Sequence, residues 1–467
     1  MDIVLDSNEQ TPAIEQVVRS IRGAIQRSEL KPGQRLPSIR QMCARNGLSF
    51  YTVVGAYERL QSNGLISAQA GRGYYVRATP SLRSTILPSD ARLTDSGKMA
   101  AFWHMFHGDD RYMKLGCGWL PPAWHDTKEL ARLIRRTANF AHSSLVEYGD
   151  PSGYLPLRQN LALHLSAKLQ VSLDASHLLT TLGATQALDL VIRHLIEPGD
   201  EVLVDDPCNS TLVQLLNLRG ARVIGVARLP DGPDMETFER AVTMRKVKAF
   251  FINSQLHNPT GTSLSPRSAF LLLQMAYAHD VILVEDDVYG DFCSNQNSLV
   301  TLDGLRKVIY IGSFSKTLSA NLRVGYVVAP AVLLAELADL KLFTSVAVPS
   351  FFERFVCALL VDGTYMRHLE EVRRRLQTAQ AVAQENFRAW GWEIFYPATE
   401  GMFIWVRHPA IETQDAFLEQ AFRSDILLAP GSLFSATGEP NPWFRINVAH
   451  LDMTKAEPLF GGLSKAG

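Results

Sequence analysis

The feature that most constrains this fold is an alternation of short apolar runs with helical patterns over residues 113–467. The runs are rich in β-branched residues, and segments of helix length separate most of them. This order predicts an α/β domain with a mainly parallel sheet. The predicted strands are Glu201–Val204, Arg222–Val226, Ala249–Ile252, Val281–Val284, Val308–Ile311 and Val324–Val328.

Residues 1–78 follow a different pattern, with three helical segments and then a hairpin. Pro12 opens the first helix, and Ser38 and Ser49 are placed to cap the second and third. Leu65 to Val76 reads as two short strands with a glycine-rich tip. This order is typical of a winged helix-turn-helix. By itself it leaves a small protein-binding or dimerisation domain as an equal alternative.

The charge and the length both favour more than one domain. A chain of 467 residues can form two or more domains with sizeable cores. Residues 1–78 carry ten Lys/Arg and six Asp/Glu, whereas the whole chain has a net charge of −1. Residues 79–112 are polar, contain Pro and Ser, and are predicted to be a linker with a short helix over Ala101–Phe106. His104, His107, Asp109 and Asp110 match no standard metal-ligand spacing, so no metal site is expected.

The cysteines and the hydropathy pattern favour a soluble, cytoplasmic protein. The five cysteines are scattered, and their odd number argues against a complete disulfide framework. No basic-plus-apolar leader is visible, and no apolar run is long enough to span a bilayer, so no membrane partner is expected.

Residues 10–77 carry the motif Pro-Gly-x-x-Leu-Pro-Ser-x-Arg, a serine before the third helix, Ala-Tyr-x-x-Leu and a Gly-x-Gly wing. This series resembles the GntR family of bacterial regulators, which implies double-stranded DNA as a partner. Phe50 stands where the family often has an arginine, so a bidentate contact to guanine is absent there. The resemblance places Arg35 and Arg40 at the DNA backbone or base edges, Ser49, Tyr51 and Thr52 in the major groove, and Arg72 in the minor groove or at a phosphate.

The segment Ser313-Phe-Ser315-Lys316 directly follows a predicted strand, and Arg323 lies seven residues beyond the lysine. A lone lysine after a strand is usually a solvated surface residue. Here two hydroxyls and a guanidinium accompany the amine and can hold a phosphate. An amine beside a cofactor aldehyde forms a Schiff base. Ser-x-Ser-Lys followed by Leu-Arg-x-Gly resembles the lysine loop of fold-type I aminotransferases, which implies that Lys316 carries a phosphorylated aldehyde cofactor.

Three other segments suit such a site. Thr180–Leu188 reads as a strand, a glycine-led turn and a helix, whose free N–H groups can bind a phosphate, although such turns are common. Asn258 lies in an Asn-Pro-x-Gly turn, which by itself is an ordinary β-turn. Asp286 and Tyr289 follow the apolar strand Val281–Val284, where a solvated strand end is the alternative.

Together with Tyr148-Gly-Asp-Pro-x-Gly-x-x-x-Leu-Arg, these segments resemble fold-type I aminotransferases over about residues 113–450. The resemblance implies pyridoxal phosphate as cofactor. It implies a homodimer as well, because Tyr148 would reach the neighbouring subunit's cofactor phosphate. It assigns Lys316 to the cofactor's aldehyde, Gly183, Ala184, Thr185, Ser313, Ser315 and Arg323 to its phosphate, Asp286 to the ring nitrogen, Asn258 and Tyr289 to the phenolic oxygen, and Arg445 to an α-carboxylate.

One position departs from the aminotransferase pattern. The turn after Glu201–Val204 holds Asn209 and Ser210 where the family has an aromatic residue that stacks on the pyridine ring. An amide makes less dispersion contact with a ring than an aromatic side chain does. We expect this change to weaken catalytic efficiency more than cofactor binding.

The fusion of the two patterns resembles the MocR subfamily of GntR-type regulators. It implies a transcription regulator that senses an amino-acid-like primary amine through aldimine exchange at Lys316. One alternative is a metabolic aminotransferase with an accessory DNA-binding domain, and residual transaminase activity stays open. Another is a regulator whose empty cofactor domain serves only to dimerise.

Overall fold

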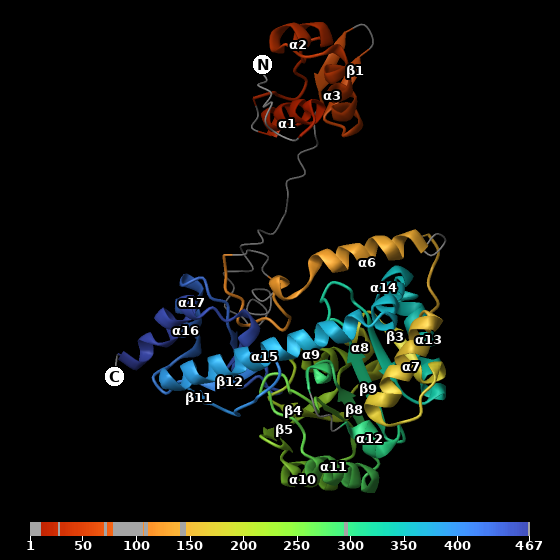
Figure 1. Ribbon diagram of the computed structural model, residues 1–467, viewed down its shortest axis with the longest axis vertical. Helices are drawn as coiled ribbons and strands as arrows, with labels where there is room; N and C mark the ends of the chain where they lie inside the picture. Colours follow the sequence, from red (N-terminus) through yellow and green to blue (C-terminus); the bar gives the residue numbers. More distant parts are fainter. Residues whose placement is uncertain are drawn as a thin grey trace. The chain divides into compact units, whose positions relative to one another are not determined.

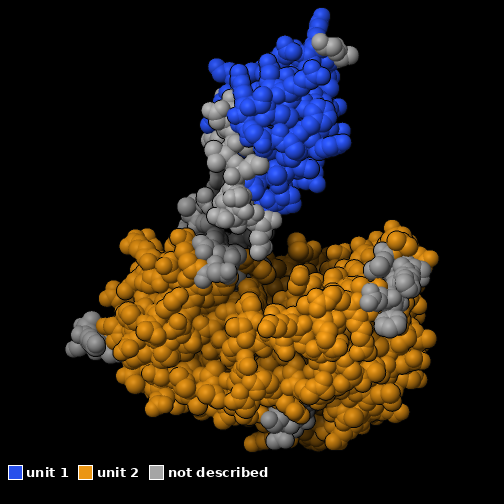
Figure 2. All heavy atoms as spheres, turned by 45° about the horizontal axis from the view of Figure 1, so that its top comes forward, with its two compact units in different colours: residues 1–92 blue, residues 93–467 orange. Residues whose placement is uncertain are grey.

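The computed structural model describes residues 11–26, 29–69, 72–77, 106, 111–140, 146–293 and 298–465. The chain divides into two compact units, residues 1–92 and 93–467 (Figure 2). The expected boundary at residue 78, most of the expected linker, and His104, His107, Asp109 and Asp110 lie outside the described residues, so these stay predictions.

The first unit contains the expected three helices and hairpin (Figure 1). Its core is made of apolar residues from all three helices and both strands, among them Val17, Met42, Val53, Tyr57 and Val76. The elements are α1 (Ala13–Gln26), α2 (Ile39–Asn46), α3 (Phe50–Ser62), β1 (Ile66–Gln69) and β2 (Gly73–Val76), and the two strands pair antiparallel.

Both expected helix caps form. The Ser38 hydroxyl accepts a hydrogen bond from the Gln41 N–H at 3.3 Å, and the Gln41 side chain accepts one from the Ser38 N–H at 3.0 Å. This reciprocal pair is a capping box, which satisfies two N–H groups at the start of α2. The Ser49 hydroxyl accepts from the Thr52 N–H at 3.1 Å and caps α3.

The second unit is built on a sheet whose strands run in the order β3-β10-β9-β8-β7-β4-β5-β6. The pairs from β9 through β5 are parallel, whereas β10 runs antiparallel to both of its neighbours and β6 runs antiparallel to β5. The strands are β3 (Leu178–Thr181), β4 (Glu201–Asp206), β5 (Arg222–Leu229), β6 (Gly232–Pro233), β7 (Val247–Ile252), β8 (Ile282–Asp286), β9 (Val308–Ser313) and β10 (Gly325–Val328).

Helices cover both faces of this sheet because successive strand residues point to opposite sides. Val202 and Val204 pack with α8, α9 and α13, whereas Leu203 packs on the opposite face with α7, α10, α11, α12 and α15. The helices are α7 (Leu155–Leu169), α8 (Gly183–Leu195), α9 (Ser210–Arg219), α10 (Met235–Met244), α11 (Pro266–Ala278), α12 (Leu299–Asp303), α13 (Ala331–Ser345) and α15 (Thr364–Ala389). The mainly parallel α/β fold is thus confirmed.

A smaller antiparallel sheet, in the order β11-β12-β14-β13, follows α15. Among the described residues, no helix combines the length and the apolar character needed to cross a bilayer. The remaining elements are α6 (Thr127–Phe140), α14 (Ser350–Val361), β11 (Glu393–Ile394), β12 (Phe403–Arg407), α16 (Gln414–Arg423), β13 (Ala429–Pro430), β14 (Phe444–Asn447) and α17 (Met453–Phe460).

Candidate cofactor site and DNA-binding surface

Polar side chains gather where the parallel strands β7, β8 and β9 end. Asn253 follows β7, Asp286 ends β8 and Ser313 ends β9. Because carboxyl ends of parallel strands meet at one edge of a sheet, these residues lie at the same edge. This is the edge at which open α/β sheets bind ligands.

Lys316 lies in the turn between β9 and β10, and contacts from α15 fix the residue after it. The Thr317 hydroxyl lies 2.9 Å from the Tyr365 hydroxyl, and its carbonyl oxygen lies 2.9 Å from Nε2 of His368. Burial of the Lys316 amine, together with the charge of Arg445, lowers its pKa to about 8. A larger fraction of this amine is therefore neutral, and nucleophilic, at neutral pH than for an ordinary lysine.

Asp286 is buried beside this turn. Burial raises the pKa of its carboxyl group to about 7. Its Oδ1 atom has no hydrogen-bond partner among the described residues. The Asn253 side chain donates to the Asp286 carbonyl at 2.6 Å and accepts from the Asn258 N–H at 2.7 Å. One amide thus fixes two of the expected cofactor ligands.

Arg445 closes the site from β14 of the smaller sheet. Its guanidinium lies 4.6 Å from the ring centre of Phe403 and 4.7 Å from that of Phe434. It donates to Oδ1 of Asn258 at 2.6 Å and to the Gly116 carbonyl at 2.5 Å. Two rings and two acceptors therefore hold this cation in one orientation.

Gly118 brings Lys316 and Tyr289 together. A β-carbon at Gly118 would lie 3.4 Å from the Lys316 amine and 3.6 Å from the Tyr289 hydroxyl. Burial raises the pKa of Tyr289, so this hydroxyl keeps its proton and can donate a hydrogen bond. Tyr289 also packs edge-on against Phe403, with ring centres 5.3 Å apart.

Hydrogen-bond donors also gather at the start of α8. Arg323 donates to the Ser315 hydroxyl at 3.4 Å and to the Leu182 carbonyl at 3.0 Å. Its φ of +52° is in the left-handed region, which costs a non-glycine residue roughly 1 kcal/mol or more. Gly183 allows the close approach, because a β-carbon there would lie 2.8 Å from the guanidinium. Ser313, Ala184 and Thr185 belong to the same strand end and helix start.

These residues fit pyridoxal phosphate. The unpartnered Asp286 Oδ1 suits the protonated ring nitrogen, and the helix start with Arg323 suits a dianionic phosphate. Lys316 supplies the amine. Over the described ranges, no cluster of three or more His, Cys, Asp or Glu side chains is placed to hold a metal ion.

Two residues that the sequence analysis related to the cofactor, Tyr148 and Asn209, lie apart from the cluster around Lys316 or are engaged in another contact. Tyr148 is 87 % exposed on the surface of the subunit. The Asn209 side chain accepts from the Thr211 N–H at 3.0 Å and caps α9. The residue that replaces the stacking aromatic therefore has a structural role of its own.

Asn253 and Gly118 were missed in the sequence. Asn253 carries the signal that pointed to Asp286, a polar residue directly after an apolar strand, and that signal could have found it. Gly118 has no such signal, because only the folded chain brings residues 116–118 next to Lys316 and Arg445.

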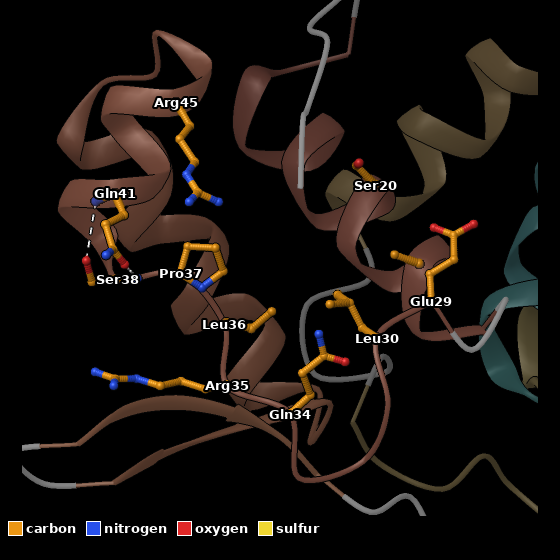
Figure 3. A pocket seen from close by; sticks show the side chains of 11 residues that line it. Ser20, Glu29, Leu30, Gln34, Arg35, Leu36, Pro37, Ser38, Gln41 and Arg45 are labelled. Atoms are coloured by element: carbon orange, nitrogen blue, oxygen red, sulfur yellow. Dashed lines mark hydrogen bonds between the residues drawn. The ribbon is translucent and has the colours of Figure 1, made fainter.

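The expected DNA contacts lie at the surface of the first unit. The side chains of Arg35, Arg40, Ser49, Tyr51 and Arg72 are exposed, and that of Thr52 is half-buried. A surface pocket lies between α1 and the start of α2, and Arg45 and Gln41 line it (Figure 3). Arg35 extends away from Leu30 and Gln34 in this view.

Comparison with protein families decides the assignment. The model for aminotransferase class I and II matches residues 110–463, and the model for bacterial regulatory proteins of the gntR family matches residues 13–76. The chain belongs to the aminotransferase class I and II family. It also carries a GntR-type helix-turn-helix domain at its N-terminal end, as the sequence motifs indicated.

Several relatives share the fusion. An uncharacterised HTH-type transcriptional regulator YdcR of Escherichia coli is 27 % identical, over 93 % of this chain and 94 % of its own. The probable rhizopine catabolism regulatory protein MocR of Rhizobium meliloti is 26 % identical, over 81 % of this chain and 78 % of its own.

Other relatives are aminotransferases and match a smaller share of the chain than YdcR does. A 2-aminoadipate transaminase of Thermus thermophilus is 30 % identical, over 69 % of this chain and 80 % of its own. The crystal structure of the α-aminoadipate aminotransferase LysN from the same species, complexed with N-(5'-phosphopyridoxyl)-L-leucine, matches with a TM-score of 0.71 and 26 % identity, over 81 % of this chain and 96 % of its own. This aminotransferase family member is thus a DNA-binding regulator with a pyridoxal phosphate domain of the MocR type.

Proposed function

We propose that this regulator senses an amino-acid-like primary amine at Lys316. The observation that carries the proposal is the joint placement of Lys316 and Arg445 in one buried site of a chain that has a DNA-binding domain. When bound, pyridoxal phosphate supplies an aldehyde carbon that primary amines attack. Lys316 would hold that carbon when no effector is present, and the primary amine of an effector would replace the Lys316 amine there and release it.

The other side chains orient the two partners. Asp286 keeps a proton at the ring nitrogen, since its Oδ1 atom is an acceptor without a partner among the described residues. Asn258 and Tyr289 donate to the phenolic oxygen. Arg445, fixed between two aromatic rings, binds the effector carboxylate with its planar fork. The effector alters DNA binding to the extent that it favours one conformation of the chain over another.

Matched ligands test this function. We expect an amino acid that changes the absorbance of the bound cofactor to change the affinity for DNA selected from a random library by the full-length protein. The corresponding amine without the carboxylate should change the DNA affinity of the natural protein less than the amino acid does. In the Arg445→Leu variant the amino acid and this amine should change the DNA affinity equally, because the partner of the carboxylate is gone. If amines change the spectrum and never the DNA affinity, the sensing function is wrong.

A metabolic aminotransferase is the second candidate, favoured by the 30 % identity to a 2-aminoadipate transaminase. The cap that Asn209 makes in place of a stacking aromatic weighs against fast turnover. Steady-state assays with panels of amino acids and keto acids separate the two functions. Turnover at ordinary rates, of about 1–1000 per second, without sequence-specific DNA binding would support the enzyme.

We also propose a homodimer that works in the bacterial cytoplasm, where its DNA lies. Tyr148, Val146 and Phe343 are each more than four-fifths exposed, which suits a surface that a second subunit covers. Sedimentation measures the oligomeric state. If Tyr148 acts on the partner's cofactor, mixed dimers of Tyr148→Phe and Lys316→Ala should contain one site with neither change.

A further inference from the structure

Two exposed aromatic side chains begin the third helix of the DNA-binding unit. Phe50 and Tyr51 are 56 % and 85 % exposed, and their ring centres lie 6.2 Å apart with the edge of one facing the other. Among the described residues 11–77, these two are the large hydrophobic side chains that are exposed. Adjacent exposed aromatics on a small domain indicate a contact surface.

The fold of the unit does not need these two rings. The residues that attach α3 to the core are Val53, Ala56, Tyr57 and Leu60, and all four are buried. Ser49 supplies the helix cap. Phe50 and Tyr51 are therefore available to a partner at no cost to the core.

The polar neighbours of the two rings are already engaged. The hydroxyls of Ser49 and Thr52 lie 2.7 Å apart, and the Ser49 hydroxyl also accepts from the Thr52 N–H. These two hydroxyls bond to each other, so one hydroxyl donor of the pair remains for a base contact, which would leave the cap in place. The large exposed side chains at the tip of α3 are the two aromatic rings.

The charge of the first unit indicates the partner. Exposed cations lie on α2 and around the hairpin, and cations on a helix-turn-helix unit bind DNA phosphates. The apolar feature that base edges show in the major groove is the C5-methyl group of thymine, and apolar side chains such as Phe contact it. The exposed cations at these places are Lys31, Arg35, Arg40, Arg45, Arg72 and Arg77, whereas Arg19 and Arg59 lie on α1 and α3.

We propose that Phe50 and Tyr51 form an apolar reading surface that packs against thymine methyl groups in the major groove. This inference deepens the DNA-binding function, and it names thymine as the base that the tip of α3 selects. Burial of one methyl group contributes enough to change affinity about fourfold.

The experiment removes only the methyl group. DNA is selected from a random library with the full-length protein, and each thymine of the selected sequence is replaced in turn by deoxyuridine. We expect one or more replacements to weaken binding about fourfold at constant salt. In the double variant Phe50→Ala, Tyr51→Ala, the same replacements should leave the affinity unchanged.

Phe270→Ala is the matched control, because Phe270 is 64 % exposed on α11 of the other unit. This variant should keep the full response to deoxyuridine. The inference is overturned if no thymine responds in the natural protein, or if the double variant responds as strongly. If the protein selects no DNA sequence at all, the DNA-binding function fails and the inference fails with it. If it selects a sequence that does not respond to deoxyuridine, only the inference fails.

Discussion

The two units present their functional side chains in opposite ways. The first unit places Arg40 and Tyr51 on its surface, where water and salt surround them. The second unit buries Asp286 and the amine of Lys316, and moves the pKa values of both groups to between 7 and 8. The same chain thus uses exposed charge for DNA and buried, tuned groups for its cofactor.

This difference has consequences for stability and for control. An exposed arginine costs the fold little, and its effect on DNA depends on salt. A buried carboxyl group costs stability until a partner satisfies it. We therefore expect changes of exposed arginines in the first unit to alter DNA binding alone, and changes of buried titratable groups in the second unit to alter folding, pH dependence and cofactor binding together.

Lys316→Ala should give the largest effect. Reduction with borohydride should attach the cofactor covalently to the natural protein and not to the variant, because the variant lacks the attacking amine. Mass spectrometry of the peptide that contains Lys316 measures the attachment. Lys128→Ala, an exposed lysine on α6, is the control and should label normally. Labelling of the variant at another lysine would place the cofactor elsewhere.

Asp286→Asn should raise the free energy of unfolding of the cofactor-free protein by roughly 2–4 kcal/mol at pH 8. The folded-state pKa of Asp286 is raised from 3.8 to about 7, so the folded protein binds more protons than the unfolded chain between these values. Stability is then greatest at the acidic end and falls as pH rises through 7.

Denaturant unfolding at several pH values measures this effect. The variant should lose part of the slope between pH 4 and 7, and should be the more stable protein at pH 8. Glu285 should contribute the same slope of unfolding free energy against pH in both proteins, because burial raises the pKa of its carboxyl group to about 7 as well. Equal slopes in the two proteins would show that Asp286 is not the group that titrates.

The rate of cofactor binding should follow the ionisation of Lys316. We expect the rate for the cofactor-free protein to rise with pH and to level off with a midpoint near 8, since only the neutral amine attacks. Stopped-flow absorbance measures this midpoint. A midpoint near that of an ordinary lysine, about 10.4, would contradict the burial of the amine.

Arg40→Ala should weaken DNA binding without altering the cofactor spectrum. If Arg40 contacts one phosphate, the affinity should fall for all sequences alike, and the slope of log affinity against log salt should decrease by about 1. Fluorescence anisotropy at several salt concentrations measures both. A loss that is confined to one sequence would identify Arg40 as a base contact instead.

Ser49→Ala should give the smallest effect. Loss of the cap on α3 should lower the free energy of unfolding of the first unit by about 1 kcal/mol. Thermal unfolding measures this change, and Ser49→Asp, which restores an acceptor, should recover it. Because residues 93–467 form a compact unit of their own, we expect their unfolding transition to stay in place.

Much of the fold could be predicted from the sequence, because local patterns encode it. The caps at Ser38 and Ser49 and the strands β8 and β9 follow from short-range rules, although each of these strands ends two residues later than predicted, at Asp286 and at Ser313. Asp286, Lys316 and Arg445 could also be named, because each stands in a motif with a characteristic order.

The rest of the site depends on contacts between distant segments. The approach of Gly118 to Lys316, and the bonds of Arg445 to Asn258 and Gly116, join residues that are 187 or more positions apart. The engagement of the Asn209 amide as a cap likewise became visible only in the structure. No local pattern predicts such contacts.

The sequence by itself determined the two domain types and the cofactor, and it predicted the lysine that would hold this cofactor, because propensity, capping and motif order act over a few residues. Only the tertiary structure decided how acidic and how accessible these groups are. The pKa values of Lys316 and Asp286 come from burial and from charges that other elements bring near. The exposure of Phe50 and Tyr51 depends on which face of α3 the core covers.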